Sequence, residues 1–278
     1  MIISIASGKG GTGKTTVAVN LALSLETVQL IDCDVEEPNV HLFFNTDLER
    51  VEEVSIPVPR VDIKKCDFCR KCAEFCEYHA IAVVPNEVLV FNELCHGCGG
   101  CTLVCPQDAI TEERRVLGYI DRGKHDGIDL WRGVLNPGEP MATPLIRQLK
   151  KRIDPNKTVI LDAPPGTACP VIETVQGSDF TLLVSEPTPF GLADLRIAID
   201  VLKELELKYG VVLNRADIGD KGVEDFCTKE EIPILMKIPH SFEIASLYSE
   251  GRPFVLELED WREKFLVLYE QILRVMET

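Results

Sequence analysis

The chain has 278 residues, 45% of them hydrophobic, and a formal net charge of −16 at pH 7. This length has room for one α/β domain of ordinary size and a smaller unit. A chain this acidic repels phosphate backbones and anionic lipids, and no local basic patch stands out. Together these features argue against nucleic-acid binding and stable membrane association. No segment approaches the ~20 apolar residues that a membrane-spanning helix needs.

Eleven cysteines are a high number for a chain without a signal peptide. The N-terminus runs directly into an apolar stretch at residues 1–6, so we expect a cytoplasmic protein. Thiols in a reducing compartment favour metal or redox roles over disulfides. Eight of the cysteines lie between Cys66 and Cys105, which confines the expected metal chemistry to one region.

A glycine-rich segment follows the apolar stretch and fits the pattern G-x-x-x-x-G-K-[ST]. Residues 1–6 read as a buried strand and residues 15–25 as a helix, which is the context that a phosphate-binding loop requires. The loop's backbone N–H groups and the helix N-terminus would bind a polyphosphate, with Lys14 at the β- and γ-phosphates and Thr15 on Mg²⁺. A purely structural glycine turn is the alternative. The predicted nucleotide-binding residues of the loop are Gly8, Lys9, Gly10, Gly11, Thr12, Gly13, Lys14, Thr15 and Thr16.

A second lysine, Lys9, stands at the start of this loop before Gly10 and Gly11. The arrangement resembles the deviant Walker A loop of the MinD, ParA, Mrp and nitrogenase-iron-protein family. The resemblance implies an α/β fold with a mostly parallel sheet flanked by helices, ATP or ADP with Mg²⁺ as ligand, and a homodimer that forms on ATP binding. In that family the lysine reaches the nucleotide of the other subunit. A solvated loop lysine is the ordinary alternative.

Acidic residues follow two further predicted strands. Residues 27–31 lead to Asp32 and Asp34, and residues 157–161 lead to Asp162 and a Pro-Pro-Gly-Thr segment. The carboxyl ends of parallel strands border the ligand crevice of an α/β sheet, and Asp162 has the Walker B position that helps to hold Mg²⁺. The family resemblance implies that Asp34 orients the attacking water and Asp32 assists Mg²⁺, although the two roles could be exchanged. Helix capping is the alternative for both.

The residues predicted to be catalytic are therefore Lys9, Lys14 and Asp34. A later strand at 210–213 leads to Asn214, which by the same resemblance recognises the adenine base. A capping role is the alternative for Asn214.

Two cysteine runs with the spacing C-x-x-C-x-x-C-x-x-x-C lie 29 residues apart, beginning at Cys66 and Cys95. They resemble a bacterial-type ferredoxin with two [4Fe–4S] clusters, a small α+β fold. The predicted division places it at 57–113, inserted between 1–56 and 114–278 of the P-loop domain. In such ferredoxins the fourth cysteine of each run ligates the other cluster. One cluster would thus take Cys66, Cys69, Cys72 and Cys105, and the second Cys95, Cys98, Cys101 and Cys76.

Crossed ligation would make the fold of the insert depend on its metal. Zinc is the alternative for paired C-x-x-C motifs. His96, inside the second run, reads as an exposed loop residue. The remaining cysteines are Cys33, Cys169 and Cys227. A buried small hydrophobe is the simple interpretation of Cys33 and Cys169. A sharper hypothesis gives Cys169 a metal site that responds to nucleotide. Cys227 has no assigned role.

Other elements follow from periodicity. Hairpins are predicted at 80–91 and 116–135, helices at 143–153 and 191–205, and strands at 180–185 and 233–238. The C-terminal segment 260–276 is an amphipathic helix. Because its polar face mixes acidic and basic residues rather than being basic, we expect it to pack on the core and not on a membrane.

These features predict a slow Mg-dependent ATPase that couples nucleotide state to iron–sulfur chemistry. The outcome would be gated electron transfer, or assembly of a metal cofactor or cluster for a client or redox protein. The alternatives are a MinD-like positioning or scaffold ATPase with a cluster sensor, and a ferredoxin-type electron carrier whose P-loop only stabilises the fold.

Overall fold

The computed structural model describes residues 1–25 and 27–277. Its main feature is a nine-stranded sheet in the order β11-β10-β9-β1-β8-β2-β7-β6-β3. The strands from β11 to β7 are parallel, and β6 and β3 add to the edge in antiparallel register. This is the mostly parallel α/β fold that the sequence predicts. The parallel strands are β1 (Ile2–Ala6), β2 (Val28–Asp32), β7 (Ile128–Leu135), β8 (Thr158–Asp162), β9 (Phe180–Ser185), β10 (Tyr209–Asn214) and β11 (Ile234–Ile238).

Helices cover both faces of this sheet, because the buried strands alternate their side chains between two cores. In β9, Phe180 and Leu182 join one core, whereas Leu183 joins the core on the opposite face. The first face is covered by α1 (Lys14–Leu25), α8 (Phe242–Ser249) and α9 (Trp261–Glu277). The second is covered by α4 (Thr143–Lys150), α5 (Cys169–Val175), α6 (Pro189–Glu204) and α7 (Gly222–Lys229). We call this assembly the body.

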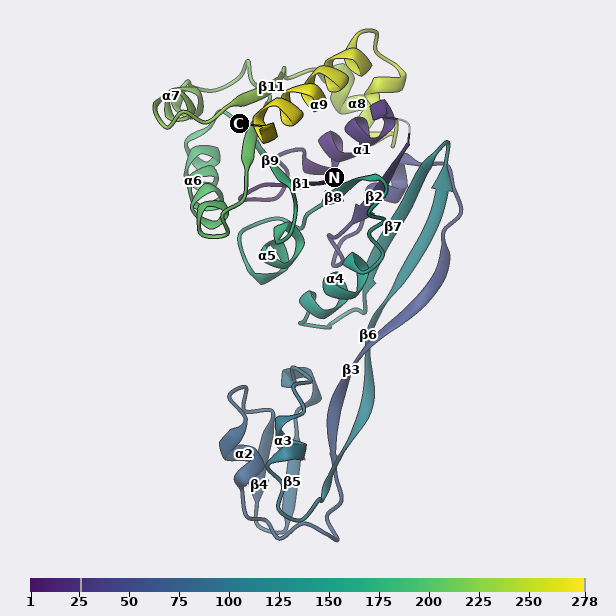
Figure 1. Cartoon of the computed structure of the whole chain (residues 1–278), viewed down its shortest axis with the longest axis vertical. Helices are drawn as coiled ribbons and strands as arrows, with labels where there is room; N and C mark the ends of the chain where they lie inside the picture. The colour runs from purple at the N-terminus through teal and green to yellow at the C-terminus, as the bar shows by residue number, and fades with distance from the viewer. Residues whose placement is uncertain (26, 278) are drawn as a thin grey trace.

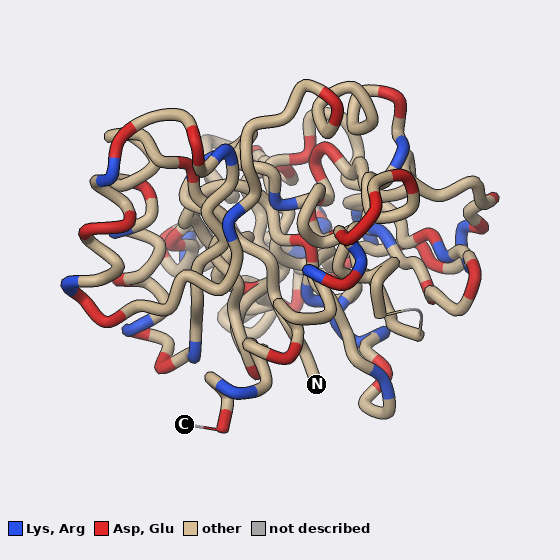
Figure 2. Tube along the Cα trace, turned by 90° about the horizontal axis from the view of Figure 1, so that it is seen from above, with Lys and Arg blue, Asp and Glu red and all other residues tan. Residues whose placement is uncertain are grey.

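The C-terminal helix α9 packs as the sequence predicts. Trp261, Phe265, Leu268 and Ile272 are buried in the first core. Within residues 1–25 and 27–277, no helix combines the length and the apolar character that crossing a bilayer demands. Seen from above, the body carries Asp and Glu over many of its loops and helices, with Lys and Arg between them (Figure 2).

The two long strands β3 (Glu49–Val61) and β6 (Ile110–His125) form a ribbon that leaves the body (Figure 1). The sequence did not predict β3, because Pro57 and Pro59 interrupt it. Proline lacks the N–H that an inner strand must donate, but β3 is the last strand of the sheet, where the missing donors are tolerated.

The ribbon ends in a small region that we call the cysteine unit, residues 62–109 (Figure 1). It contains α2 (Lys71–Phe75), the hairpin of β4 (Ile81–Val84) and β5 (Glu87–Val90), and α3 (Gly100–Leu103). Short 3₁₀ turns lie at Val40–Phe43, Asn92–Leu94 and Phe254–Leu256. The predicted hairpins at 80–91 and 116–135 are confirmed. The predicted division at 57 and 113 falls inside the ribbon strands.

Candidate functional site

The glycine-rich loop connects β1 to α1, and two of its glycines have backbone conformations that other residues rarely adopt. Gly11 has φ +77° and Gly13 has φ +99°. A Cβ atom at Gly13 would also lie 2.5 Å from Asn214 Nδ2. Glycine is therefore required there by both conformation and space. The loop leads directly into α1, whose first residue is Lys14.

Behind the loop, Thr15 and the predicted Walker B residue meet. The Thr15 hydroxyl donates a hydrogen bond of 2.7 Å to Asp162 Oδ2. The second carboxylate oxygen, Asp162 Oδ1, is buried and has no hydrogen-bond partner among the described residues. A buried carboxylate oxygen without a donor is costly unless a cation or an ordered water satisfies it. These two residues thus fit a Mg²⁺ site with its hydration shell.

Asp32 has a structural task besides its predicted one. Its carboxylate is fully buried and accepts backbone N–H bonds from Asp34, Asn39 and Val40 at 2.9–3.1 Å. These bonds close the loop that follows β2. Asp32 therefore fixes the position of Asp34, and its predicted assistance to Mg²⁺ remains a prediction.

Three carboxylates and one ammonium group lie close together at this edge of the sheet. Burial raises the pKa of Asp162 to about 7 and that of Asp34 to about 6, although the nearby Lys14 opposes both shifts. Burial and the Asp162 charge raise the pKa of Asp32 well above its usual value. Burial lowers the pKa of Lys14. The negative charge exceeds what Lys14 can balance, which a divalent cation would correct.

A cavity of about 450 Å³ adjoins these groups, a volume within the range of small-ligand sites. Asn214 lines it, as predicted for adenine recognition. In this structure its amide donates to the Thr12 carbonyl at 2.8 Å, and its oxygen accepts from the Arg215 N–H at 3.0 Å. Sequence reasoning did not assign several further lining residues, of which two follow Asp34 and the others come from the last part of the chain. They are Glu37, Asn39, Arg215, Ser241, Ile244, Ala245 and Tyr248.

Lys9 forms an ion pair within its own chain. Its Nζ lies 3.4 Å from Oε2 of Glu186, and the same carboxylate accepts a 2.6 Å hydrogen bond from Arg215 Nη1. The Glu186 side chain is only 10% exposed. No sequence motif indicates a role for Glu186, since it follows β9 and approaches Lys9 only through the order of strands in the sheet.

The cysteine unit has an internal repeat in its backbone as well as in its sequence. Left-handed residues occur in pairs that are 29 residues apart. The same offset relates the hydrogen bonds of 3.3–3.5 Å that cysteine sulfurs accept from backbone N–H groups. Such donors stabilise a thiolate. The left-handed pairs are Phe68 and Gly97, Arg70 and Gly99, and His79 and Asp108; the sulfurs are those of Cys66 and Cys95, and of Cys76 and Cys105.

The eight cysteines divide into two groups of four around two separate cavities. The outer cysteine site contains Cys66, Cys69, Cys72 and Cys105, and it lies against Val61 and Ile110 at the far end of the ribbon. The inner cysteine site contains Cys76, Cys95, Cys98 and Cys101, and it lies against Pro57, Pro59 and Glu112, nearer the body. Each site takes three cysteines from one run and the fourth from the other, which is the crossed grouping that the ferredoxin resemblance implies.

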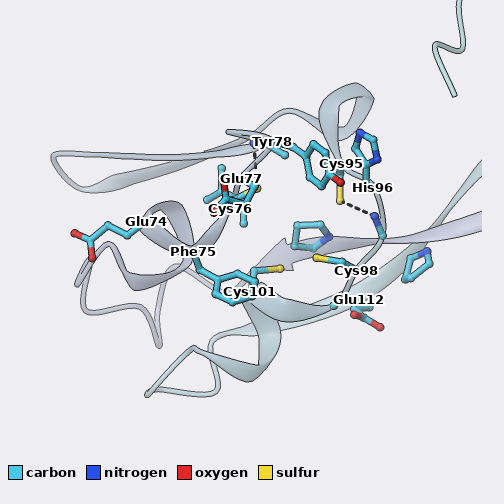
Figure 3. Close-up of a pocket in the computed structure, with 16 residues that line it drawn as sticks. Glu74, Phe75, Cys76, Glu77, Tyr78, Cys95, His96, Cys98, Cys101 and Glu112 are labelled. Atoms are coloured by element: carbon cyan, nitrogen blue, oxygen red, sulfur yellow. Dashed lines mark hydrogen bonds between the residues drawn. The ribbon is translucent and has the colours of Figure 1, made fainter. Parts of the chain in front are cut away.

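Figure 3 shows the inner cysteine site with Phe75 and Tyr78 among its lining side chains. The Tyr78 ring stacks on His96 at 3.6 Å between centroids. His96 is exposed and lines the cavity's rim, as the loop interpretation expects. In the described part of the chain, no three His, Cys, Asp or Glu side chains converge closely enough to hold a single metal ion. The thiols of the inner site line a cavity of about 470 Å³, whereas those of the outer site enclose only about 20 Å³.

The three remaining cysteines lie in the body. Cys33 is fully buried, and burial raises the pKa of its thiol far above the usual value. This confirms its interpretation as a small core residue. Cys227 is also buried, on α7. Cys169 is exposed at the first residue of α5, so the buried-hydrophobe interpretation was wrong for it.

Fold and site together define a nucleotide-binding protein of the P-loop class. The sequence profile described as the CobQ/CobB/MinD/ParA nucleotide binding domain matches residues 3–254. The chain belongs to this family.

Among its relatives is an uncharacterized protein of Methanocaldococcus jannaschii, 33% identical over 92% of this chain and 91% of the relative. A protein of Pyrococcus horikoshii named iron-sulfur cluster carrier protein is 26% identical over 91% of this chain and 79% of its own length. The septum site-determining protein MinD of P. horikoshii, solved with Mg-ADP, superposes with a TM-score of 0.59. It is 20% identical and covers 98% of this chain and 95% of its own. This likeness supports the fold of the body.

Proposed function

We propose that this chain is a Mg-dependent ATPase that couples its nucleotide state to two [4Fe–4S] clusters held by the cysteine unit. The observation that carries the proposal is the crossed grouping of eight cysteines around two cavities. Two complete sets of four thiols with this grouping are typical of a two-cluster ferredoxin. We also propose that the protein works in a reducing, cytoplasmic compartment, where such thiols stay available.

The residues present fit such clusters. Each site offers four cysteines, and in each site two of the sulfurs accept N–H bonds that favour the thiolate form. When bound, the clusters would supply one-electron transfer. A zinc site draws four ligands to one ion at ~2.3 Å from each sulfur. The cavity of about 470 Å³ between the thiols of the inner site favours the larger group.

On the nucleotide side, each residue has a distinct task. Lys14 and the loop N–H groups would hold the phosphates, Thr15 and Asp162 would position Mg²⁺, and Asp34 would orient the water that attacks the γ-phosphate. Lys9 would cross to the second copy of the chain when ATP closes a homodimer. To do so it must leave Glu186, its partner in this structure.

The body and the cysteine unit share a sheet, which offers a route for coupling. The Leu135 N–H at the end of β7 donates to the Val35 carbonyl at 2.8 Å, one residue after Asp34. Because β7 pairs with β6, and β6 with β3, a shift at Val35 would reach the ribbon that bears the unit. A tenfold difference in ATP affinity between two states of this sheet needs ~1.4 kcal/mol.

Electron transfer is the first candidate outcome, because four protein thiolates per site would retain a cluster as a resident group. Cluster or cofactor delivery is the second candidate, and the names of several relatives favour it, since they are called iron-sulfur cluster carrier proteins. A positioning or scaffold role, the third, has no observation in its favour here.

Anaerobic purification tests the proposal. We expect about eight irons and eight sulfides per chain, the content of two [4Fe–4S] clusters, and an EPR signal after reduction. We also expect Mg-dependent ATP turnover that Lys14→Ala abolishes. Zinc in place of iron, or a chain that does not bind adenine nucleotides, would overturn the proposal.

A second measurement separates the two candidate outcomes. The loaded protein is incubated with ATP and a metal-free acceptor protein, and iron is followed on both. Gated electron transfer is supported if the iron stays on this chain and the rate of cluster reduction changes with ATP. Iron that moves to the acceptor supports delivery instead.

A further inference from the structure

Basic residues flank the first three cysteines of the outer site, contrary to the prediction that the chain has no local basic patch. Four basic residues occur within eight positions, in a chain whose net charge is −16. All four side chains are exposed. These four residues do not form a continuous basic run, because cysteines separate the two pairs in the sequence. We call them the basic rim: Lys64, Lys65, Arg70 and Lys71.

The internal repeat shows that the fold of the loop does not demand these charges. The residue 29 positions after Lys64 is Glu93, and the counterpart of Lys71 is Gly100. Arg70 and its counterpart Gly99 share the left-handed conformation, with φ 65° and 72°. A matching backbone thus carries basic side chains in one loop and none in the other. The cations belong to the outer site specifically.

Packing explains why the counterparts of Arg70 and Lys71 in the inner loop are glycines. A Cβ at Gly100 would lie 2.1 Å from Phe75 Cε1, and one at Gly99 would lie 2.9 Å from Glu112 Oε1. The inner loop is pressed against α2 and the ribbon. The outer loop, at the ribbon's far end, has room for long side chains that point into solvent.

The cations of the basic rim have no ionic partner within the described chain. Among the ion pairs of residues 1–25 and 27–277, none includes a member of the rim. Two carboxylates in the same stretch accept hydrogen bonds from uncharged donors. Asp62 accepts the Lys64 N–H at 3.0 Å, and Asp67 accepts from the Cys69 N–H at 3.2 Å and from Gln107 Nε2 at 3.1 Å. These bonds leave both carboxylates negatively charged, but residues 62–71 still hold four cations against two anions, which is a local excess of positive charge.

We propose that the basic rim is the docking surface for an acidic partner protein, which binds over the outer cysteine site. The inference deepens the proposed function, on which it rests, by naming the kind of partner that the cysteine unit meets. Ile63, which is 44% exposed beside Lys64, adds an apolar contact. Small interfaces with opposite charges are typical of transient redox encounters, where the charges speed association.

The surrounding charge favours a protein over a polyanion. A duplex or an anionic membrane extends far beyond the rim and would meet a molecule whose net charge is −16. The acidic body would repel both the duplex and the anionic membrane. A compact protein with a local acidic face can contact the tip of the cysteine unit alone, because the ribbon holds that tip away from the body (Figure 1).

Cross-linking with a carbodiimide, which joins lysine amines to carboxylates, tests the inference on the full, anaerobically purified chain. The probe is a small acidic ferredoxin. We expect cross-links at Lys64, Lys65 or Lys71, and binding that weakens about tenfold between 50 and 200 mM salt. The triple variant Lys64→Glu, Lys65→Glu, Lys71→Glu should bind about tenfold more weakly or worse. It leaves the left-handed Arg70 intact.

The matched control reverses three exposed lysines of the body, Lys203→Glu, Lys221→Glu and Lys229→Glu, and should change binding less than twofold. Equal weakening by both triple variants would overturn the proposal. Cross-links confined to the body, displacement of the probe by short duplex DNA, or preferential cross-linking between two copies of this chain would do the same.

Iron and sulfide content is measured in parallel. A wild-type chain without clusters defeats the proposed function, whereas a loaded chain with no rim-dependent binding defeats only the docking surface.

Discussion

At the scale of single residues, Glu186 holds the Lys9 side chain against its own chain through an ion pair. The carboxylate is nearly buried and forms ion pairs with both Lys9 and Arg215. If Lys9 must reach a second copy of the chain, this pair opposes the closed state. Arg215 would still pair with Glu186 after Lys9 has left, so the nearly buried carboxylate would not lose its last ionic partner.

We therefore predict that Glu186→Gln tightens the ATP-dependent dimer. The dissociation constant, measured by sedimentation with a non-hydrolysable ATP analogue, should fall about fivefold, the scale of one partly exposed ion pair. Glu173→Gln is the control, because Glu173 pairs with Arg147 on α4 at 2.8 Å, away from the P-loop. An unchanged dimer in Glu186→Gln, with wild type dimerising normally, would show that the pair does not restrain Lys9.

Gly100 offers a second residue-scale prediction. Because an added Cβ would lie 2.1 Å from Phe75 Cε1, Gly100→Ala should destabilise the cysteine unit by ~1–3 kcal/mol. Lys71→Ala, at the equivalent position of the other loop, should cost little. Proteolysis of the unit under native conditions measures both. Restoration of stability by adding Phe75→Ala would assign the effect to this contact, and equal sensitivity of the two loops would refute it.

The side chains that could be predicted from the sequence are those within local motifs. Lys14, Thr15 and Asp162 belong to patterns whose strand and helix context is visible along the chain, and they meet as expected. Glu186 could not be predicted, because its proximity to Lys9 depends on the placement of β9 beside β1. The basic rim could have been found by comparing the two cysteine loops position by position.

At the scale of elements, the junction of β2 and β7 connects the nucleotide site to the ribbon. Gly133 in β7 allows Val35 to pack closely, since a Cβ there would lie 2.6 Å from Val35 Cγ1. Val35 follows Asp34 directly. A displaced Val35 would thus move the residue that is predicted to orient water.

We predict that Gly133→Ala lowers the turnover number for ATP about tenfold while nucleotide binding changes little, because catalysis depends on sub-ångström placement. Gly123→Ala in β6 is the control, since its Cβ would lie 2.5 Å from Leu48 Cδ2 and would not contact Val35. Steady-state ATPase assays and titration with an ATP analogue separate the two effects. Equal turnover in the two variants would remove Val35 from the coupling route.

Periodicity located the parallel strands and the long helices to within a few residues, but it missed β3 and the short helices α5 and α8. The prolines hid β3, because the pattern cannot reveal that the strand lies at an edge. Each of the short helices has no more than eight residues, so packing rather than local propensity defines them.

At the scale of the whole molecule, the cysteine unit is joined to the body by two strands of one sheet. The large hydrophobic cores of the body use residues outside the unit, apart from Cys95 at the margin of one of them. The body should therefore fold without the unit. Pro59 and Glu112 face each other across the ribbon, so a two-residue Asn-Gly turn can replace residues 60–111 and close the ribbon as a hairpin.

We predict that this shortened chain folds, binds Mg-ATP and retains no iron. It also tests coupling, because linkage is reciprocal. If nucleotide changes the equilibrium constant for reduction of the cysteine unit, then reduction must change the nucleotide affinity by the same factor. Affinity for an ATP analogue, measured by calorimetry under argon with and without dithionite, should differ about tenfold in the full chain, as ~1.4 kcal/mol of coupling requires. In the shortened chain dithionite should have no effect. If reductant leaves the full chain's affinity unchanged as well, the two halves of the molecule do not communicate, however continuous the sheet between them.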